Sequence, residues 1–164
     1  MSSTAQAFEL LQGYKGISLD EKTVILIFSA EWHIYFCTTL LPKLENVYKQ
    51  VKVPQDAEFL YVSCDRSKEE FERFSKTLPW PSIPYDDPLR MQLINAFVPP
   101  SNKPSQPVIV SLSLKKDNTK VLCSNALGRL KSEASDGVQD FPWAGSVAET
   151  GCTICTALLM CTIQ

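Results

Sequence analysis

The sequence is poor in histidine, balanced in charge and free of long apolar runs, and each absence argues against a class of function. One histidine, His33, is too few for the paired ligands of a metal centre, so neither a metal site nor a cofactor is predicted. The 16 Lys and Arg residues nearly balance the 18 Asp and Glu residues, leaving a net charge of −2. With this balance and no recognisable nucleic-acid motif, neither DNA nor RNA is expected as a partner.

The chain also lacks the basic and apolar N-terminal regions of a secretory signal. It has six cysteines, but 164 residues with 45% hydrophobic content can build a core without a disulfide scaffold. We therefore expect one globular domain with mostly free thiols, located in the cytoplasm.

What the sequence does contain is organised around residues 23–44. The apolar run Val24–Phe28 predicts a strand that is buried on both faces. Trp32 lies just after it, and apolar residues at helical spacing then predict a helix to about Val51. Pro42 lies inside that helix and is expected to kink it, because proline removes a backbone hydrogen bond.

The rest of the chain alternates strands and helices. Two further buried strands are predicted at Ala57–Ser63 and Val108–Leu112, and an edge strand at Lys120–Cys123. One short helix is expected to begin at a Ser67–Glu70 capping box, and a second to cover Leu89–Phe97. A proline-rich stretch between the two short helices excludes regular structure there. The order β, α, β, α, α, β, β predicts an α/β fold with a mixed central sheet flanked by helices.

Five short motifs carry a resemblance to a known family. They are Val24–Trp32, Val62–Ser67, Leu78–Tyr85, Gln106–Pro107 and Phe141–Trp143. In this order they resemble the motifs of the tryparedoxins, the trypanothione-using branch of the thioredoxin superfamily, and the chain is similar to nucleoredoxin domains too. The resemblance implies a thioredoxin-like fold whose partners are protein disulfides or peptides, with trypanothione and glutathione as candidate small ligands.

The active-site loop departs from the family pattern. Where tryparedoxins have Trp-Cys-Pro-Pro-Cys, this chain has Trp32-His33-Ile34-Tyr35-Phe36-Cys37. Counting on from Trp32 places His33 at the nucleophilic position. Counting back from Pro42 places Cys37 at the resolving position, after an insertion of one residue. We prefer the second register, because a loop absorbs an insertion more easily than a kinked helix. In both registers the first Cys is absent.

The absence of that Cys has a chemical meaning. Dithiol exchange needs an exposed thiolate with a lowered pKa and a second thiol that resolves the mixed disulfide. The sequence therefore favours a redox-family binding protein, or pseudo-oxidoreductase. The alternative is an active oxidoreductase that uses Cys37 as a monothiol, or with tail cysteines. Whether Cys37 is a reactive thiol or a buried small hydrophobe stays open, and for His33 a structural role is favoured over a catalytic one.

The resemblance also implies a substrate-binding face formed by four residues. Trp32 and Trp80 would line this face, although core packing accounts for such side chains as well. The peptide bond before Pro107 would be cis, and the backbone at Gln106 would then face a bound peptide. A given X-Pro bond is rarely cis, so this expectation depends on the resemblance alone.

The C-terminal segment differs in character from the rest. We expect the thioredoxin-like domain to cover residues 1–143, followed by a Cys-containing tail over residues 144–164 that is uncharged from Thr150 on. Cys152 and Cys155 form a Cys-x-x-Cys without a preceding buried strand, and we interpret their spacing as incidental. The tail is shorter than the ~20 apolar residues of a spanning helix, so membrane contact is not expected.

Overall fold

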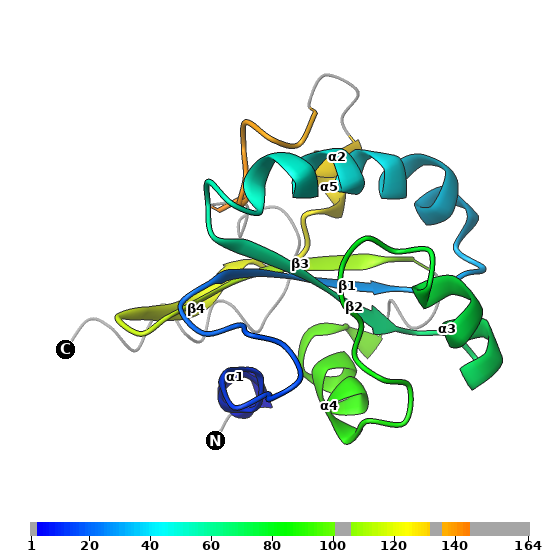
Figure 1. Cartoon of the computed structure of the whole chain (residues 1–164), viewed down its shortest axis with the longest axis horizontal. Helices are drawn as coiled ribbons and strands as arrows, with labels where there is room; N and C mark the ends of the chain where they lie inside the picture. The colour runs from blue at the N-terminus through cyan, green and yellow to red at the C-terminus, as the bar shows by residue number, and fades with distance from the viewer. Residues whose placement is uncertain (1–2, 101–105, 132–135, 145–164) are drawn as a thin grey trace.

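The protein is built on a four-stranded mixed sheet with helices on both faces (Figure 1). This computed structural model describes residues 3–100, 106–131 and 136–144. The strands lie in the order β2-β1-β3-β4, with bounds Ala57–Ser63, Thr23–Ser29, Val108–Lys115 and Asn118–Cys123. β1 pairs parallel with β2 and antiparallel with β3, and β4 pairs antiparallel with β3 at the edge. The predicted mixed α/β sheet is confirmed.

Helices cover the two faces of this sheet. α2 (Leu41–Val51) and α5 (Leu127–Lys131) lie on one face, and α1 (Ser3–Gln12) and α4 (Pro88–Phe97) lie on the other (Figure 1). α3 (Lys68–Ser75) lies at the end of the sheet and contributes Phe71 and Phe74 to the core on the α2 side.

β1 is the centre of the fold because both of its faces are covered. All 7 of its residues are buried. Ile25 and Ile27 join the core cluster beneath α2, whereas Leu26 and Phe28 join the cluster on the side of α1 and α4. This division follows from the two-residue period of a strand. The continuous apolar run that predicted β1 thus serves two separate cores.

The helix after β1 begins at Ile34 and contains a wide turn. Phe36–Leu40 is a π-helix, in which the N–H of Leu41 donates to the carbonyl of Phe36. Pro42 follows in the first turn of α2 rather than deep inside a regular helix. Because proline cannot donate the hydrogen bond that would close an α-turn, the irregularity lies just before it. The predicted irregularity near Pro42 thus takes the form of a π-turn, which holds one extra residue, and the kink itself stays a prediction.

The predicted N-cap of α3 is confirmed, and the Glu70 side chain reaches back to Arg66 N, one residue before the Ser67 N–H of a regular capping box. The Ser67 hydroxyl accepts a hydrogen bond from Glu70 N at 3.2 Å, and Glu70 Oε2 accepts one from Arg66 N at 2.9 Å. The proline-rich segment after α3 has no regular helix. It adds a single parallel bridge, between Ser82 and Tyr61, to the outer edge of β2.

Within the described residues, no helix is long and apolar enough to cross a membrane. Cys37, Cys64 and Cys123, the cysteines of the described ranges, form no disulfide with one another. The tail pair Cys152 and Cys155 lies outside the described residues.

Phe36→Ala is expected to lower the free energy of unfolding by about 3–5 kcal/mol, because it leaves a cavity at a buried aromatic position. The Phe36 side chain is 0% exposed and its ring packs against Phe74, with 6.3 Å between the ring centroids. Urea denaturation followed by tryptophan fluorescence measures the loss. The matched control is Ile34→Ala, at a side chain that is 75% exposed, and its effect should stay below about 0.5 kcal/mol. Equal losses would contradict this assignment of the core.

Candidate functional site

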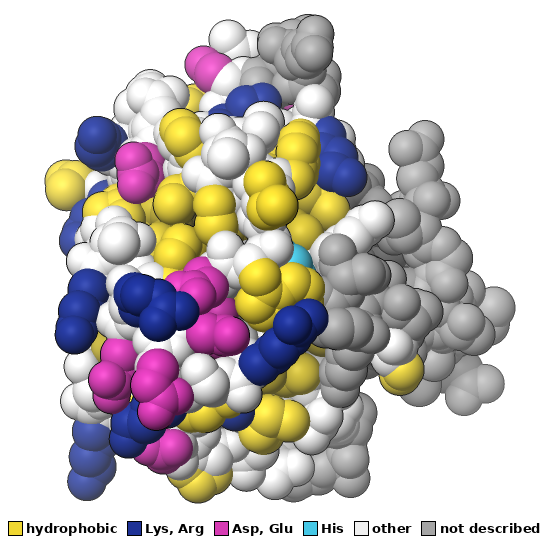
Figure 2. All heavy atoms as spheres, turned by 90° about the vertical axis from the view of Figure 1, so that its right-hand side faces the viewer, with side chains coloured by type: hydrophobic (Ala, Val, Ile, Leu, Met, Phe, Trp, Pro, Cys, Tyr) yellow, Lys and Arg dark blue, Asp and Glu magenta, His cyan; other side chains and the backbone are white. Residues whose placement is uncertain are grey.

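The candidate site lies where β1 and β2 end and the next helix begins. This end of the molecule faces the viewer in Figure 2, where hydrophobic side chains gather beside acidic and basic ones. Two large apolar side chains of the helix start are exposed, Ile34 at 75% and Tyr35 at 42%. Exposed apolar side chains grouped in this way are typical of surfaces that contact a partner.

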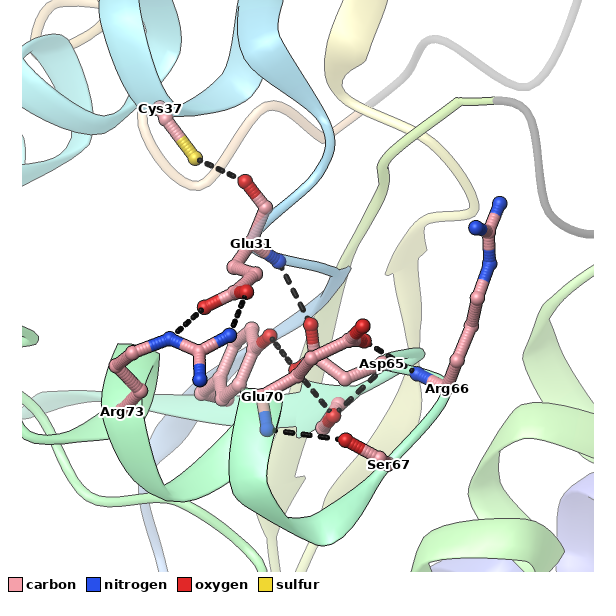
Figure 3. Close-up of polar contacts among 9 residues, drawn as sticks. Glu31, Cys37, Asp65, Arg66, Ser67, Glu70 and Arg73 are labelled. Atoms are coloured by element: carbon pink, nitrogen blue, oxygen red, sulfur yellow. Dashed lines mark hydrogen bonds and ion pairs between the residues drawn. The ribbon is translucent and has the colours of Figure 1, made fainter.

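Asp65 joins the end of β2 to the loop after β1 (Figure 3). Its side chain is buried, and its carboxylate accepts a hydrogen bond from Glu31 N at 2.7 Å. It also accepts one from the Tyr61 hydroxyl at 2.9 Å and one from the Ser63 hydroxyl at 2.6 Å. Burial, and then the charge of Asp65, raise the pKa of Tyr61, so this phenol stays protonated and donates. Such a set of donors compensates the cost of burying a carboxylate.

Surface charges hold the same loop from outside. Arg73 of α3 forms an ion pair with Glu31, in which Nε lies 3.1 Å from Oε2 (Figure 3). The guanidinium of Arg66 lies over the ring of Trp32, 4.6 Å from its centroid. Ion pairs on the surface contribute little stability, so the buried Asp65 network is the stronger constraint on the loop.

His33 points into the protein. It is 7% exposed, and its Nδ1 lies 3.0 Å from the hydroxyl of Ser29 at the end of β1. The Trp32 ring lies edge-on to the imidazole, with 4.4 Å between the ring centroids. This packing fits the structural role that the sequence favoured for His33.

Cys37 lies in the π-turn, and its thiol acts as a hydrogen-bond donor. The Sγ atom donates to the carbonyl of Glu31 at 3.4 Å (Figure 3). Burial raises the pKa of the Cys37 thiol above its ordinary value, and the negative charges of Asp65 and Glu31 raise it further. A raised pKa leaves less of the nucleophilic thiolate at neutral pH. Cys37 is half-buried, and its raised pKa favours an unreactive thiol over a reactive thiolate.

A cavity of about 280 Å³ lies beside this loop, between the sheet and α4. Its polar and reactive lining consists of His33, Cys64, Asp65, Arg90 and Gln106. The cavity thus brings together two residues that the sequence predicted for the site, His33 and Gln106, although they lie far apart in the chain.

The other predicted residues occupy different surroundings. Trp80 is buried and packs against Tyr48 and Phe59, with ring centroids 5.5 Å and 5.3 Å away, as core packing would have it. Trp32 contacts His33 but does not line the cavity. In the described ranges, no group of three or more His, Cys, Asp and Glu side chains is arranged to hold a metal ion.

Pro107 is buried directly before β3, but the peptide bond before it is not cis. Among the described residues the cis peptide bond is Phe141–Pro142, so the expectation of a cis bond between Gln106 and Pro107 was wrong. That expectation rested on a resemblance, whereas the isomer of an X-Pro bond depends on the local packing of each chain.

Sequence reasoning missed Asp65 and Arg90. The available signal for Asp65 was a carboxylate placed two residues after the end of a buried strand. Arg90 gave no signal, because it is an ordinary polar residue of a short helix. Its Nη1 donates to the Ser63 carbonyl at 2.9 Å and its Nε to the Tyr85 carbonyl at 2.8 Å, and both contacts require the tertiary fold.

Comparison with known proteins now gives the family. The family model described as Thioredoxin-like matches residues 20–109, more than half of the chain. The chain belongs to this family. Tryparedoxin from Trypanosoma brucei is 26% identical, with a TM-score of 0.66 over 88% of this chain and 100% of that one. Tryparedoxin II from C. fasciculata, at 23% identity and a TM-score of 0.69, covers 90% of this chain and 99% of its own. The thioredoxin-like fold and the resemblance to tryparedoxins are confirmed.

Nucleoredoxins are relatives of this thioredoxin-like chain by sequence. Human nucleoredoxin is 28% identical over 133 residues, which is 80% of this chain and 28% of that protein. The probable nucleoredoxin 1 of Arabidopsis thaliana is 38% identical over 77 residues, which is 46% of this chain and 13% of that protein. The chain therefore spans less than a third of the length of these relatives.

Asp65→Ala is expected to lower the free energy of unfolding by about 2–4 kcal/mol, because it removes the acceptor of buried donors on Tyr61 and Ser63. Urea denaturation at neutral pH measures the difference from the unchanged chain. Asp86→Ala is the matched control, since the Asp86 side chain is 68% exposed and pairs with Lys68 on the surface. The control should lose no more than about 1 kcal/mol. A neutral Asp65→Ala would show that the network does not hold the loop.

Cys37 is expected to be alkylated slowly at pH 7, with a rate that rises through a midpoint above the ~8.5 of an ordinary thiol. The reason is its raised pKa, which delays formation of the thiolate as pH increases. Iodoacetamide rates between pH 6 and pH 10 give the midpoint, in a chain whose other cysteines are replaced by serine. The same chain in urea is the control, and its midpoint should fall to the ordinary value. A midpoint below pH 7 in the folded chain would contradict the structure's placement of this thiol.

Proposed function

We propose that this thioredoxin-like protein is a redox-family binding protein that has lost dithiol catalysis. The observation that carries the proposal is the surroundings of two side chains, His33 in the loop after β1 and Cys37 in the π-turn that follows it. His33, directly after Trp32, is buried against Ser29, and the Cys37 thiol donates to a backbone carbonyl and has a raised pKa. Neither group supplies the low-pKa thiolate that starts a disulfide exchange.

The surface beside this loop supports a binding role. Ile34 and Tyr35 present exposed apolar area at the start of the helix, and the adjacent cavity adds a recess lined by both polar and apolar groups. Sites that combine an apolar recess with a few placed polar groups are typical of ligand recognition. Such a surface suits a peptide or a segment of a partner protein, and disulfide-bearing partners follow from the family.

The proposal also covers the small ligands, the cellular location and the bounds of the domain. One tryparedoxin II structure, 24% identical to this chain, is complexed with glutathionylspermidine, so thiol peptides of low molecular weight are candidate ligands here as well. We place the protein in the cytoplasm, where its cysteine thiols would stay reduced. We assign residues 1–143 to the thioredoxin-like domain and residues 144–164 to a C-terminal tail.

The test is an insulin-disulfide reduction assay with dithiothreitol. The unchanged chain is expected to reduce insulin no faster than dithiothreitol alone, because no thiolate of lowered pKa starts the exchange. Cys37→Ser should give the same background rate. A tryparedoxin with an intact Cys-Pro-Pro-Cys, added at the same concentration, is the positive control.

The variants also identify the thiol that acts if turnover is found. Turnover above background that disappears in Cys37→Ser would overturn the proposal and make Cys37 catalytic. Turnover that survives this change and disappears in the double variant Cys152→Ser, Cys155→Ser would assign the activity to the tail pair. Either result would make the chain an active oxidoreductase.

A further inference from the structure

The apolar surface at the start of the helix carries a cation over each of its two aromatic rings. The Arg66 guanidinium lies 4.6 Å from the centroid of the Trp32 ring, and the Lys131 ammonium lies 5.3 Å from the centroid of the Tyr35 ring. Ile34, which is 75% exposed, stands between the two aromatic residues in the chain. We call these five residues the basic-apolar patch. Figure 2 shows Lys and Arg side chains beside hydrophobic ones at this end of the molecule.

The two cations of the patch come from separate parts of the fold. Arg66 belongs to the loop between β2 and α3, and Lys131 is the last residue of α5. Both residues are exposed, and in the described ranges neither forms an ion pair. The ion pairs there join Lys22 to Asp56, Lys68 to Asp86 and Arg73 to Glu31. Arg66 and Lys131 therefore remain available to the carboxylates of a partner.

The acidic side chains nearest the loop are already engaged. Glu31 is paired with Arg73, and the buried Asp65 accepts hydrogen bonds from Glu31 N and from two hydroxyls. Glu70 Oε2 accepts the backbone N–H of Arg66, whereas the Arg66 side chain points away from the carboxylates of Asp65 and Glu70 (Figure 3). The patch thus presents positive charge, although the chain as a whole has a net charge of −2.

We propose that the basic-apolar patch binds an acidic segment of a partner protein that carries an apolar anchor. The anchor side chain packs on Ile34 and Tyr35 and removes their apolar area from water. Carboxylates on either side of the anchor pair with Arg66 and Lys131, and the guanidinium of Arg66 can bind a carboxylate through two parallel hydrogen bonds. The inference rests on the proposed binding function and names the chemistry of the partner.

Two other occupants fit the patch less well. An anionic membrane surface is typically bound by clusters of about 4–8 Lys and Arg residues, and the patch has only Arg66 and Lys131. A second copy of this chain, related by a two-fold axis through the patch, would bring like charges together, which is unfavourable. The exposed cations therefore favour an acidic segment of another protein.

The test titrates the full-length, ¹⁵N-labelled chain with three peptides and follows its amide NMR signals. The acidic peptide is Asp-Glu-Leu-Phe-Asp-Glu, and its controls are the charge-reversed Lys-Lys-Leu-Phe-Lys-Lys and the anchor-free Asp-Glu-Gly-Ser-Asp-Glu. We expect the acidic peptide to shift the signals of residues 32–35 and to bind about tenfold more tightly than either control. Its affinity should fall as the NaCl concentration rises, because salt screens exposed charges.

Charge-reversal variants assign this preference to the patch. Arg66→Glu and Lys131→Glu should each weaken binding of the acidic peptide about fivefold. The double variant should bind the basic peptide more tightly than the acidic one, a gain that misfolding cannot produce. Lys120→Glu is the matched control, at an exposed residue of β4 that pairs with Ser113 at the opposite end of the sheet, and it should have no effect.

The apolar part of the patch is tested in the same way. Ile34→Ser should weaken binding of the acidic peptide several-fold, because it removes the apolar surface on which the anchor packs. Val53→Ser, at a side chain that is 85% exposed and lies outside the patch, should leave the affinity unchanged. Equal affinities in the two variants would overturn the role of Ile34.

The outcomes separate this inference from the proposed function. An acidic peptide that does not bind, or that binds no better than the basic one, overturns the inference and leaves the insulin result untouched. Binding only to vesicles of phosphatidylserine and phosphatidylcholine, or self-association that Ile34→Ser abolishes, would overturn it in favour of a membrane or a second copy. Insulin turnover above background would overturn the binding-protein proposal, while the preference for an acidic peptide would still stand.

Discussion

The buried carboxylate of Asp65 is the constraint on which the site depends. It accepts a hydrogen bond from the backbone of the loop after β1 and others from side chains of β2, so it joins two strands at the edge where they end. The position of Trp32 and His33 follows from that connection, because the loop has few residues between Glu31 and the helix. A buried carboxylate whose hydrogen bonds are satisfied holds the loop in one conformation, whereas surface ion pairs alone would allow several conformations.

Cys37 and Cys64 lie on opposite sides of the sheet. The Cys37 thiol belongs to the α2 side, and the cavity with Cys64 belongs to the α4 side. A working dithiol needs both sulfurs on one side and within reach of each other. Among the residues that the structure describes, Cys37 and Cys64 are therefore not placed to act together as a dithiol.

The two central parallel strands were well predicted. The bounds of β2 matched the prediction and those of β1 came within one residue, because a short apolar run between turn signals is typical of a buried strand. The hairpin of β3 and β4 is longer than predicted, since β3 ends at Lys115 rather than Leu112 and β4 begins at Asn118 rather than Lys120. Ser67 and Glu70 predicted the start of α3 for a local reason, the capping box. The cavity was beyond the sequence, since its wall joins Cys64, Arg90 and Gln106 from three separate segments. Nor does an apolar pattern distinguish an α-turn from a π-turn, because the two differ by a single residue.

The π-turn at Phe36–Leu40 has a consequence for how positions in this helix correspond to those of relatives. One residue added to a regular α-helix would rotate everything after it by about 100° about the helix axis. A π-turn absorbs that residue locally, so Leu44, Val47 and Val51 still face the sheet. The π-turn lies between Trp32 and Pro42, so a count forward from Trp32 and a count backward from Pro42 differ by one residue. A helix with such a turn can hold an extra residue at this corner of the fold while the residues after it keep their packing against the sheet.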